Sequence, residues 1–208
     1  MKTRIISDKT YINMYNERIR QDHFFKKAKE QGYPARSVFK LSEIDKKYQL
    51  IRSGNFVLDL GCAPGSWLKY LSEKVGKRGK VIGIDLQDIN LELAENTVFI
   101  KKDINDLSYE DLGEKRFNII VSDMAPKTTG GKSADAARSL ELNEVAFEVV
   151  KKYLKKGGHF LFKVFESREA HDFTKDLTKY FKEVKRYSPK ATRKASSEFY
   201  VTCKSYKS

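Results

Sequence analysis

Residues 56–67, which read FVLDLGCAPGSW, constrain the fold of this chain more than any other segment. An apolar run of strand character carries one acidic residue, Asp59, and then breaks into a turn that contains Gly61 and Gly65. Apolar residues resume at Trp67 with helical spacing. A strand, a glycine-containing turn and a helix in this order are typical of the place where an open α/β sheet binds a nucleotide-like ligand.

The glycine spacing in this turn narrows the class of ligand. The glycines follow G-x-x-x-G and not G-x-G-x-x-G, so the dinucleotide fingerprint is absent. Pro64 further restricts the backbone that would otherwise wrap a pyrophosphate. We therefore expect a nucleoside without phosphates, for which S-adenosylmethionine is the candidate, bound by Gly61, Pro64, Gly65 and Trp67. Trp67 keeps a second interpretation as a core residue, which is the usual place of an aromatic side chain on an apolar face.

Strand and helix patterns alternate after residue 56. Strands are predicted over 56–60, 80–85, 97–101, 118–123, 159–165, 184–187 and 199–206, and helices over 15–30, 36–48, 134–155 and 169–182. Alternation of this kind predicts a Rossmann-like α/β fold, with a mainly parallel seven-stranded sheet and helices on both faces. The last two strands have no room for a helix between them, so we expect an antiparallel C-terminal hairpin at the sheet edge. Such a hairpin distinguishes a methyltransferase sheet from a plain dinucleotide fold.

The helix over 134–155 is expected to turn one apolar face inward and to end at a pair of glycines. Its inward residues are predicted as Ala137, Leu140, Val145, Val149 and Leu154, with Gly157-Gly158 ending the helix. No internal repeat or low-complexity linker divides the chain. We therefore expect one domain over residues 1–208, with a basic helical extension at about 1–50.

Three of the predicted strands end in an aspartate. These are Asp85, Asp103 and Asp123, and in an open α/β sheet the ligand lies beyond such strand ends. Asp85 suits acceptance of two ribose hydroxyls, and Asp103 suits acceptance from an adenine amino group. Each aspartate could instead cap the turn that follows it. Three in succession behind the glycine turn favour a ligand, and carboxylates suit a sulfonium cation.

The net charge of +13 is unevenly distributed. Residues 1–50 carry a net +6, residues 51–150 carry −3 and residues 151–208 carry +10. A solvated lysine-rich surface is one interpretation, but segregated positive charge favours a polyanion, and RNA or another nucleic acid is the commonest such partner.

No segment has transmembrane length, the first residues lack a signal-peptide core, and no amphipathic helix for a membrane surface stands out. Two cysteines and three scattered histidines give neither a disulfide framework nor metal spacing. We expect a cytoplasmic protein without a metal.

Five segments of this sequence resemble the FtsJ/RrmJ family of ribose 2′-O-methyltransferases, which use S-adenosylmethionine and act on RNA. They occur in the family order from about residue 26 to the C-terminus and read GYPARSVFKL at 32–41, DLGCAPGSW at 59–67, SDMAP at 122–126, FKVF at 162–165 and RKASSEFYV at 193–201. The resemblance implies a catalytic Lys-Asp-Lys-Glu tetrad at Lys40, Asp123, Lys163 and Glu198.

The residues themselves also support a role for Lys163. A lysine inside the apolar strand FLFKVF is unusual unless it is paired or functional. We expect Lys163 to be the base that removes the ribose proton, with Asp123 orienting it and bridging to the cofactor. Lys40 and Glu198 would position the ribose and balance charge. Desolvation and the Lys40 cation favour neutral Lys163, whereas the two carboxylates favour the charged form, and the sequence leaves that balance open. The alternative is a buried ion-pair network without chemistry.

Basic residues precede two members of the tetrad along the chain. Those before Lys40 are Arg18, Arg20, Lys26, Lys27, Lys29 and Arg36, and those before Glu198 are Lys190, Arg193 and Lys194. Each group is placed to bind RNA phosphates beside the methyl donor. Within the family that the sequence resembles, a compact chain with SDMAP is most similar to members that methylate a uridine of large-subunit ribosomal RNA, so the resemblance implies that substrate, free or in the large ribosomal subunit. No DNA partner is expected. Alternatives are methylation of a transfer-RNA anticodon loop, a non-catalytic RNA-binding module on the same fold, and a nicotinamide-dependent reductase, which the missing G-x-G-x-x-G disfavours.

Overall fold

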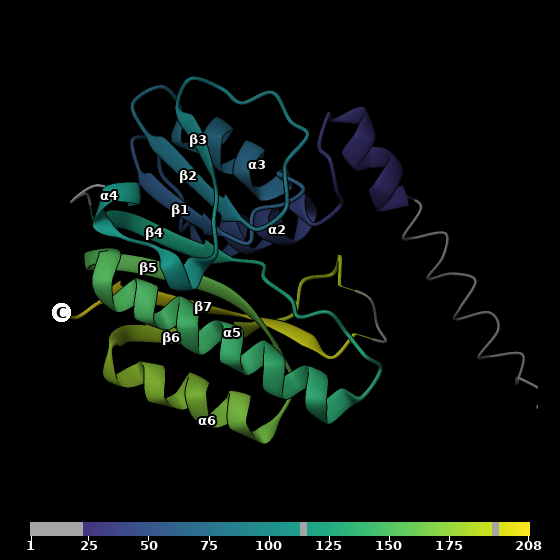
Figure 1. Ribbon diagram of the computed structural model, residues 1–208, viewed down its shortest axis with the longest axis vertical. Coiled ribbons are helices and arrows are strands. Elements are labelled where there is room, and N and C mark those ends of the chain that lie inside the picture. The colour runs from purple at the N-terminus through teal and green to yellow at the C-terminus, as the bar shows by residue number, and fades with distance from the viewer. Residues whose placement is uncertain (1–22, 113–115, 193–195) are drawn as a thin grey trace, which may run out of the picture.

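A computed structural model describes residues 23–112, 116–192 and 196–208, and shows one seven-stranded sheet (Figure 1). Its strand order is β3-β2-β1-β4-β5-β7-β6. The first five strands pair in parallel, and β7 pairs antiparallel with both β5 and β6. The strands are β1 Phe56–Leu60, β2 Lys80–Asp85, β3 Thr97–Lys101, β4 Phe117–Ser122, β5 Leu154–Phe165, β6 Phe181–Tyr187 and β7 Glu198–Tyr206. The predicted Rossmann-like sheet with an antiparallel C-terminal hairpin is confirmed, and β6 forms its outer edge.

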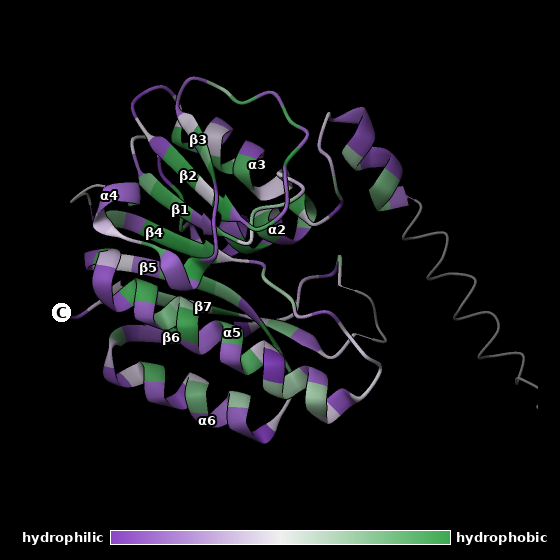
Figure 2. Cartoon of the chain, viewed as in Figure 1, coloured by the Kyte–Doolittle hydropathy of each residue, from purple (hydrophilic) through white to green (hydrophobic). Residues whose placement is uncertain are grey.

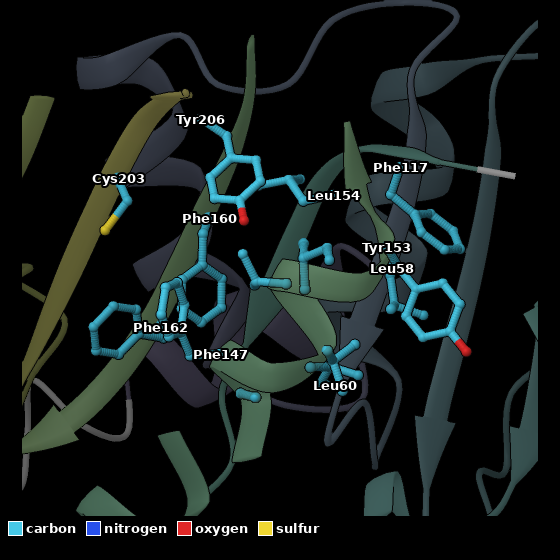
Figure 3. Close-up of a cluster of buried hydrophobic side chains, with 14 of the residues drawn as sticks. Leu58, Leu60, Phe117, Phe147, Tyr153, Leu154, Phe160, Phe162, Cys203 and Tyr206 are labelled. Atoms are coloured by element: carbon cyan, nitrogen blue, oxygen red, sulfur yellow. The ribbon is translucent and has the colours of Figure 1, made fainter. Parts of the chain in front are cut away.

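Helices cover both faces of this sheet (Figure 1). On one face, α2 and α3 contribute to a core with the apolar residues of β1. On the other face, α5 and α6 pack on a second core that contains Leu58, Phe117, Phe160 and Phe162 (Figure 3). The helices are α2 Val38–Tyr48, α3 Ser66–Val75, α4 Tyr109–Leu112, α5 Lys132–Tyr153 and α6 Arg168–Asp176, with short 3₁₀ turns at Ile104–Asp106 and Leu177–Lys179. Residues 23–30 are also helical, and the rest of the helix predicted over 15–30 lies outside the described residues.

The predicted inward face of α5 was wrong in part. Ala137 is exposed, whereas Ser139 and Asn143 are buried against the sheet. Both polar residues bind the backbone of β5, because Ser139 Oγ accepts from the Phe165 N–H at 3.1 Å and Asn143 Nδ2 donates to the Lys163 carbonyl at 2.8 Å. At these positions α5 contacts β5 through buried hydrogen bonds, where the helical spacing of apolar residues predicted apolar contacts.

The Gly157-Gly158 pair does not end α5, which is a second correction. The helix ends at Tyr153, and β5 begins at once with Leu154. In the β4–β5 register Phe117 faces Leu154 and Ile119 faces His159, so residues 155–158 bulge out opposite the single residue Asn118. Gly157 has φ +78°, a left-handed conformation that a glycine adopts at little cost. The glycines shape a bulge within a strand rather than a helix terminus.

Hydropathy follows this layered arrangement (Figure 2). The central strands are largely hydrophobic, and the outer surfaces of the helices are largely hydrophilic. Within the described ranges, no helix combines the length and the apolar character needed to cross a membrane.

Candidate active site

Lys163 lies in the apolar strand β5 and is almost fully buried. Its side chain is 7% exposed, and its neighbours Phe162 and Val164 are fully buried. The ammonium donates to Asp123 Oδ1 at 2.8 Å and to the Asp123 carbonyl oxygen at 2.6 Å. Asp123 comes directly after β4, which is the parallel neighbour of β5, so sheet pairing alone brings the two residues together. Asp123 therefore binds the buried Lys163 with both its side-chain carboxylate and its backbone carbonyl oxygen.

Lys40 of α2 and Glu198 at the start of β7 form a second ion pair. Both side chains are 13% exposed. Tyr200 connects the two pairs, because its hydroxyl donates to Asp123 Oδ1 at 2.8 Å and its ring centroid lies 5.7 Å from the Lys40 ammonium. The structure therefore brings all four predicted tetrad residues to one end of the sheet.

Tyr200 is a residue of this cluster that the sequence reasoning missed. It is fully buried, and burial together with Asp123 and Glu198 raises the pKa of its hydroxyl well above the usual value. It faces Lys163 directly in the β5–β7 register. Alternation along a strand could have found it, since residues two apart, such as Glu198 and Tyr200, point to the same face.

The glycine turn after β1 is tied to the end of β2. The Gly61 N–H donates to the Ile84 carbonyl at 2.8 Å, and Asp85 Oδ2 accepts from the Ala63 N–H at 2.9 Å. Gly61 has φ +73°, and a Cβ atom there would lie 2.4 Å from Met124 Cγ. The turn therefore requires glycine at this position, both for its backbone angle and for its close approach to the residue after Asp123.

Asp103 and Trp67, which were also predicted to bind the cofactor, use their side chains for contacts within the protein. Asp103 caps the 3₁₀ turn Ile104–Asp106, since its Oδ1 accepts from the Asn105 N–H at 2.9 Å, which is the capping interpretation weighed against adenine binding. Trp67 is 2% exposed and donates its indole N–H to the Ser37 carbonyl at 3.0 Å. It lies in the core between α2 and Tyr200, with ring centroids 5.9 Å apart. Cofactor contacts of both residues stay predictions.

Five of the residues predicted to bind RNA belong to the part of the chain that the structure describes. Lys26, Lys27 and Lys29 are exposed on the helix over 23–30, whereas Arg36 is half-buried. Lys190 is exposed on the segment between β6 and β7. Arg18, Arg20, Arg193 and Lys194 lie outside the described residues.

Glu43 links α2 to the segment that carries Lys190. It accepts from the Tyr187 hydroxyl at 2.7 Å and from the Lys190 N–H at 3.0 Å. The hydrogen bond to Glu43, aided by burial, raises the pKa of Tyr187 to about 12. The helix that carries Lys40 is thereby fixed beside the segment that leads to Glu198.

Comparison with known proteins decides the family. Residues 33–206 match the FtsJ-like methyltransferase family. The chain belongs to this family. A Bdellovibrio bacteriovorus protein named ribosomal RNA large subunit methyltransferase E is 45% identical over 192 residues, which cover 90% of this chain and 96% of that protein. A protein of the same name from Desulfatibacillum aliphaticivorans is 47% identical over 183 residues, with 87% and 88% covered.

A solved structure supports the same relationship. The crystal structure of a Plasmodium falciparum protein assigned as a ribosomal RNA methyltransferase is 28% identical, has a TM-score of 0.74, and covers 84% of this chain and 98% of that one. The predicted family and the predicted methyltransferase fold are therefore confirmed. This chain is a member of the FtsJ-like methyltransferases, and the enzyme class predicted from the sequence is confirmed with it.

The glycine turn of this FtsJ-like methyltransferase fits a cationic nucleoside such as S-adenosylmethionine. Asp59, directly behind the turn, is fully buried, and neither of its carboxylate oxygens has a hydrogen-bond partner among the described residues. Burial, with Asp123 and Asp85 nearby, raises the pKa of Asp59 well above its usual range. The raised pKa of Asp59 reflects the negative charge of Asp85 and Asp123 as well as burial, and carboxylates gathered near the glycine turn are suited to a positively charged ligand. Among the described residues, no group of His, Cys, Asp or Glu could hold a metal ion.

Proposed function

We propose that this protein transfers a methyl group from S-adenosylmethionine to the 2′-hydroxyl of a ribose in large-subunit ribosomal RNA, with a uridine as the target. The observation that carries the proposal is the pairing of buried Lys163 with Asp123, joined through Tyr200 to the Lys40–Glu198 pair beside the glycine turn. Relatives named ribosomal RNA large subunit methyltransferase E support the choice of RNA.

The cofactor would be held by the turn and the neighbouring strand ends. Gly61, Pro64 and Gly65 would shape its pocket, and Asp85 and Asp103 would accept from its nucleoside. When bound, S-adenosylmethionine supplies a methyl group on a positively charged sulfur, and that carbon–sulfur bond breaks as the methyl is transferred. The protein's own task is to align the ribose oxygen and take up its proton.

The geometry around Lys163 suits the role of base. To act as the base, Lys163 would first lose one proton, and its neutral amine would then have two N–H donors and one lone pair. Both oxygens that Lys163 contacts belong to Asp123. These contacts would hold both donors and leave the lone pair for the ribose proton, which moves from the 2′-oxygen to Lys163 Nζ. Asp123 would orient the amine, and Lys40 with Glu198 would position the ribose.

The rest of the proposal concerns the molecule around this site. Residues 1–208 would form one methyltransferase domain. Residues at about 1–50 would form a basic helical extension that binds RNA. A cytoplasmic location follows from a ribosomal substrate. The filled tetrad argues against a non-catalytic RNA-binding module.

Labelled S-adenosylmethionine, incubated with large ribosomal subunits, bare ribosomal RNA and transfer RNA, tests the function. We expect label in a ribose-methylated uridine of large-subunit RNA, identified by nucleoside analysis of the products. Label found only in transfer RNA would instead support methylation of the transfer-RNA anticodon loop. A base-methylated product would refute ribose methylation.

A further inference from the structure

A polar hollow lies at the end of the sheet where the parallel strands begin, opposite the tetrad. It has a volume of about 320 Å³ and is formed by the segment before β1, the start of β4 and the start of β5. Its charged and polar lining consists of Arg52, Asn55, Asn118, Lys155, Lys156 and His159. His159 precedes Lys163 by four positions on β5, which places the hollow roughly 13 Å along the strand from the tetrad. It is therefore separate from the site described above.

The bulge of β5 is built to form one wall of this hollow. Residues 155–158 all lie opposite Asn118, which places Lys155 and Lys156 at the hollow. A Cβ atom on Gly158 would lie 2.9 Å from the Asn118 carbonyl oxygen and 2.8 Å from that of Lys155, so the close approach requires glycine. A bulge that depends on its glycine and aims two lysines at one hollow is a specific feature of the fold.

Two asparagines present hydrogen-bond donors in the hollow. Asn118 Oδ1 accepts from the Phe56 N–H at 2.9 Å, and Asn55 Oδ1 accepts from the Arg52 N–H at 2.8 Å. Because each oxygen is engaged by the backbone, each side-chain NH₂ is left as a donor, and neither has a partner among the described residues.

The charged side chains among the described residues that line the hollow are all basic. No carboxylate is among the described residues that line it. Burial, with the cations Lys204 and Arg52, lowers the pKa of His159. Amide donors and three cations without an acidic neighbour match an anion that has several acceptor oxygens, as a phosphate group does.

We propose that this hollow binds a phosphate group of the RNA backbone, remote from the nucleotide that is methylated. The proposal rests on the proposed function, because the substrate RNA supplies the phosphate. Exposed Arg52 and Lys156 make the hollow accessible to a polymer. A folded RNA held at both ends of the sheet would be fixed in orientation relative to Lys163, since phosphate contacts position a nucleic acid without reading its sequence.

Binding of the anion is tested by nuclear magnetic resonance of the full-length protein with inorganic phosphate as the probe. We expect the side-chain amide signals of Asn55 and Asn118 and the ring signals of His159 to shift, and the pKa of His159 to rise. Sodium chloride at the same ionic strength is the control. Equal responses to the two salts would show charge screening only and would overturn the proposal.

Binding of RNA is tested with the variant Arg52→Ala/Lys156→Ala. The matched control, Lys175→Ala/Lys182→Ala, removes the same charge from exposed positions on α6 and β6. For large-subunit RNA, the slope of log affinity against log salt should become less negative by roughly 0.7–0.9 for each phosphate that the variant no longer binds. The slope of the control should change less.

The outcomes separate this proposal from the proposed function. Equal slopes for the variant and its control would overturn the phosphate assignment to RNA, even if inorganic phosphate binds the hollow. A wild-type protein that binds RNA without methylating it would refute the proposed function, while a slope difference between the variants would still support the hollow.

Discussion

At the scale of single residues, charged groups in apolar surroundings carry most of the functional information. Lys163 and Asp59 both lie in strands of apolar residues, but within the described ranges only one of the two side chains has a hydrogen-bond partner. Lys163 is satisfied by Asp123, whereas the carboxylate of Asp59 has no partner among the described residues. Burial of a charge is costly unless it is paired, so each residue indicates a specific role.

Replacement of Lys163 by methionine should remove the base and keep the apolar stem. We expect Lys163→Met to lower the methyl-transfer rate by roughly 10²- to 10⁴-fold, the usual contribution of a general base. Cofactor affinity, measured by calorimetry, should stay close to that of the wild type. The exposed Lys182→Ala variant serves as the control, and a Lys163→Met protein with near-normal turnover would refute the role of base.

Asp59 should make the ligand-free protein less stable as the pH rises. Its pKa is raised in the folded state, so between the unfolded and folded pKa values the native state binds the additional proton. In that window the free energy of unfolding falls by up to about 1.4 kcal/mol per pH unit. Asp59→Asn should remove this loss and be relatively more stable at neutral pH.

Urea denaturation of both proteins at a series of pH values from 4 to 9 measures the difference. Identical pH dependence for wild type and Asp59→Asn would show that folding does not raise the pKa of Asp59 and would contradict this prediction.

At the scale of elements, irregular backbone places the functional groups. The turn after β1 depends on Gly61, and the bulge in β5 depends on Gly158. The polar residues of α5 bind the backbone of β5 beside Lys163. The glycine turn lies at the end of a strand and the bulge interrupts regular pairing, and at such places local sequence preference is weak and tertiary contacts decide the backbone.

Substitution of Gly158 by alanine should destabilise the protein through steric overlap. A Cβ atom would lie within 2.9 Å of two backbone oxygens, which the flexible end of a side chain cannot relieve. We expect Gly158→Ala to lower the free energy of unfolding by roughly 1–3 kcal/mol, as for other overpacked sites. Gly54→Ala is the comparison, because a Cβ atom there would meet nothing within 4 Å. Its loss of stability would come only from the positive φ of 82°, which an alanine adopts less readily than a glycine. Equal losses in urea denaturation would contradict the steric account of the bulge.

At the scale of the whole molecule, charge is distributed around an acidic centre. The segments before and after residues 51–150 carry the positive charge, and Glu43 joins parts of them beside the tetrad. This distribution supports the proposal of two binding surfaces, in which the basic segments would bind an RNA polyanion and the carboxylates near the glycine turn would bind a small cation.

Salt should therefore act on the two ligands in different ways. If six or more phosphates are contacted, RNA affinity should fall by roughly 10³-fold or more between 50 and 200 mM salt. Affinity for S-adenosylmethionine should change little over the same range, because a small ligand displaces few counterions compared with an RNA polyanion. Filter binding for RNA and calorimetry for the cofactor measure both, and a flat RNA response would argue against the proposed phosphate contacts.

The sequence by itself determined the order of the strands along the chain, the antiparallel hairpin and the glycine turn, because strand alternation and glycine spacing are local patterns. The four tetrad residues were identified from the resemblance of the sequence motifs to the FtsJ/RrmJ family. Only the tertiary structure decided which groups meet. Tyr200, the binding of β5 by Ser139 and Asn143, and the bulge at Gly157-Gly158 all depend on the register between distant strands and helices. Register follows from side-chain packing across the whole sheet, so no single segment of the sequence contains it.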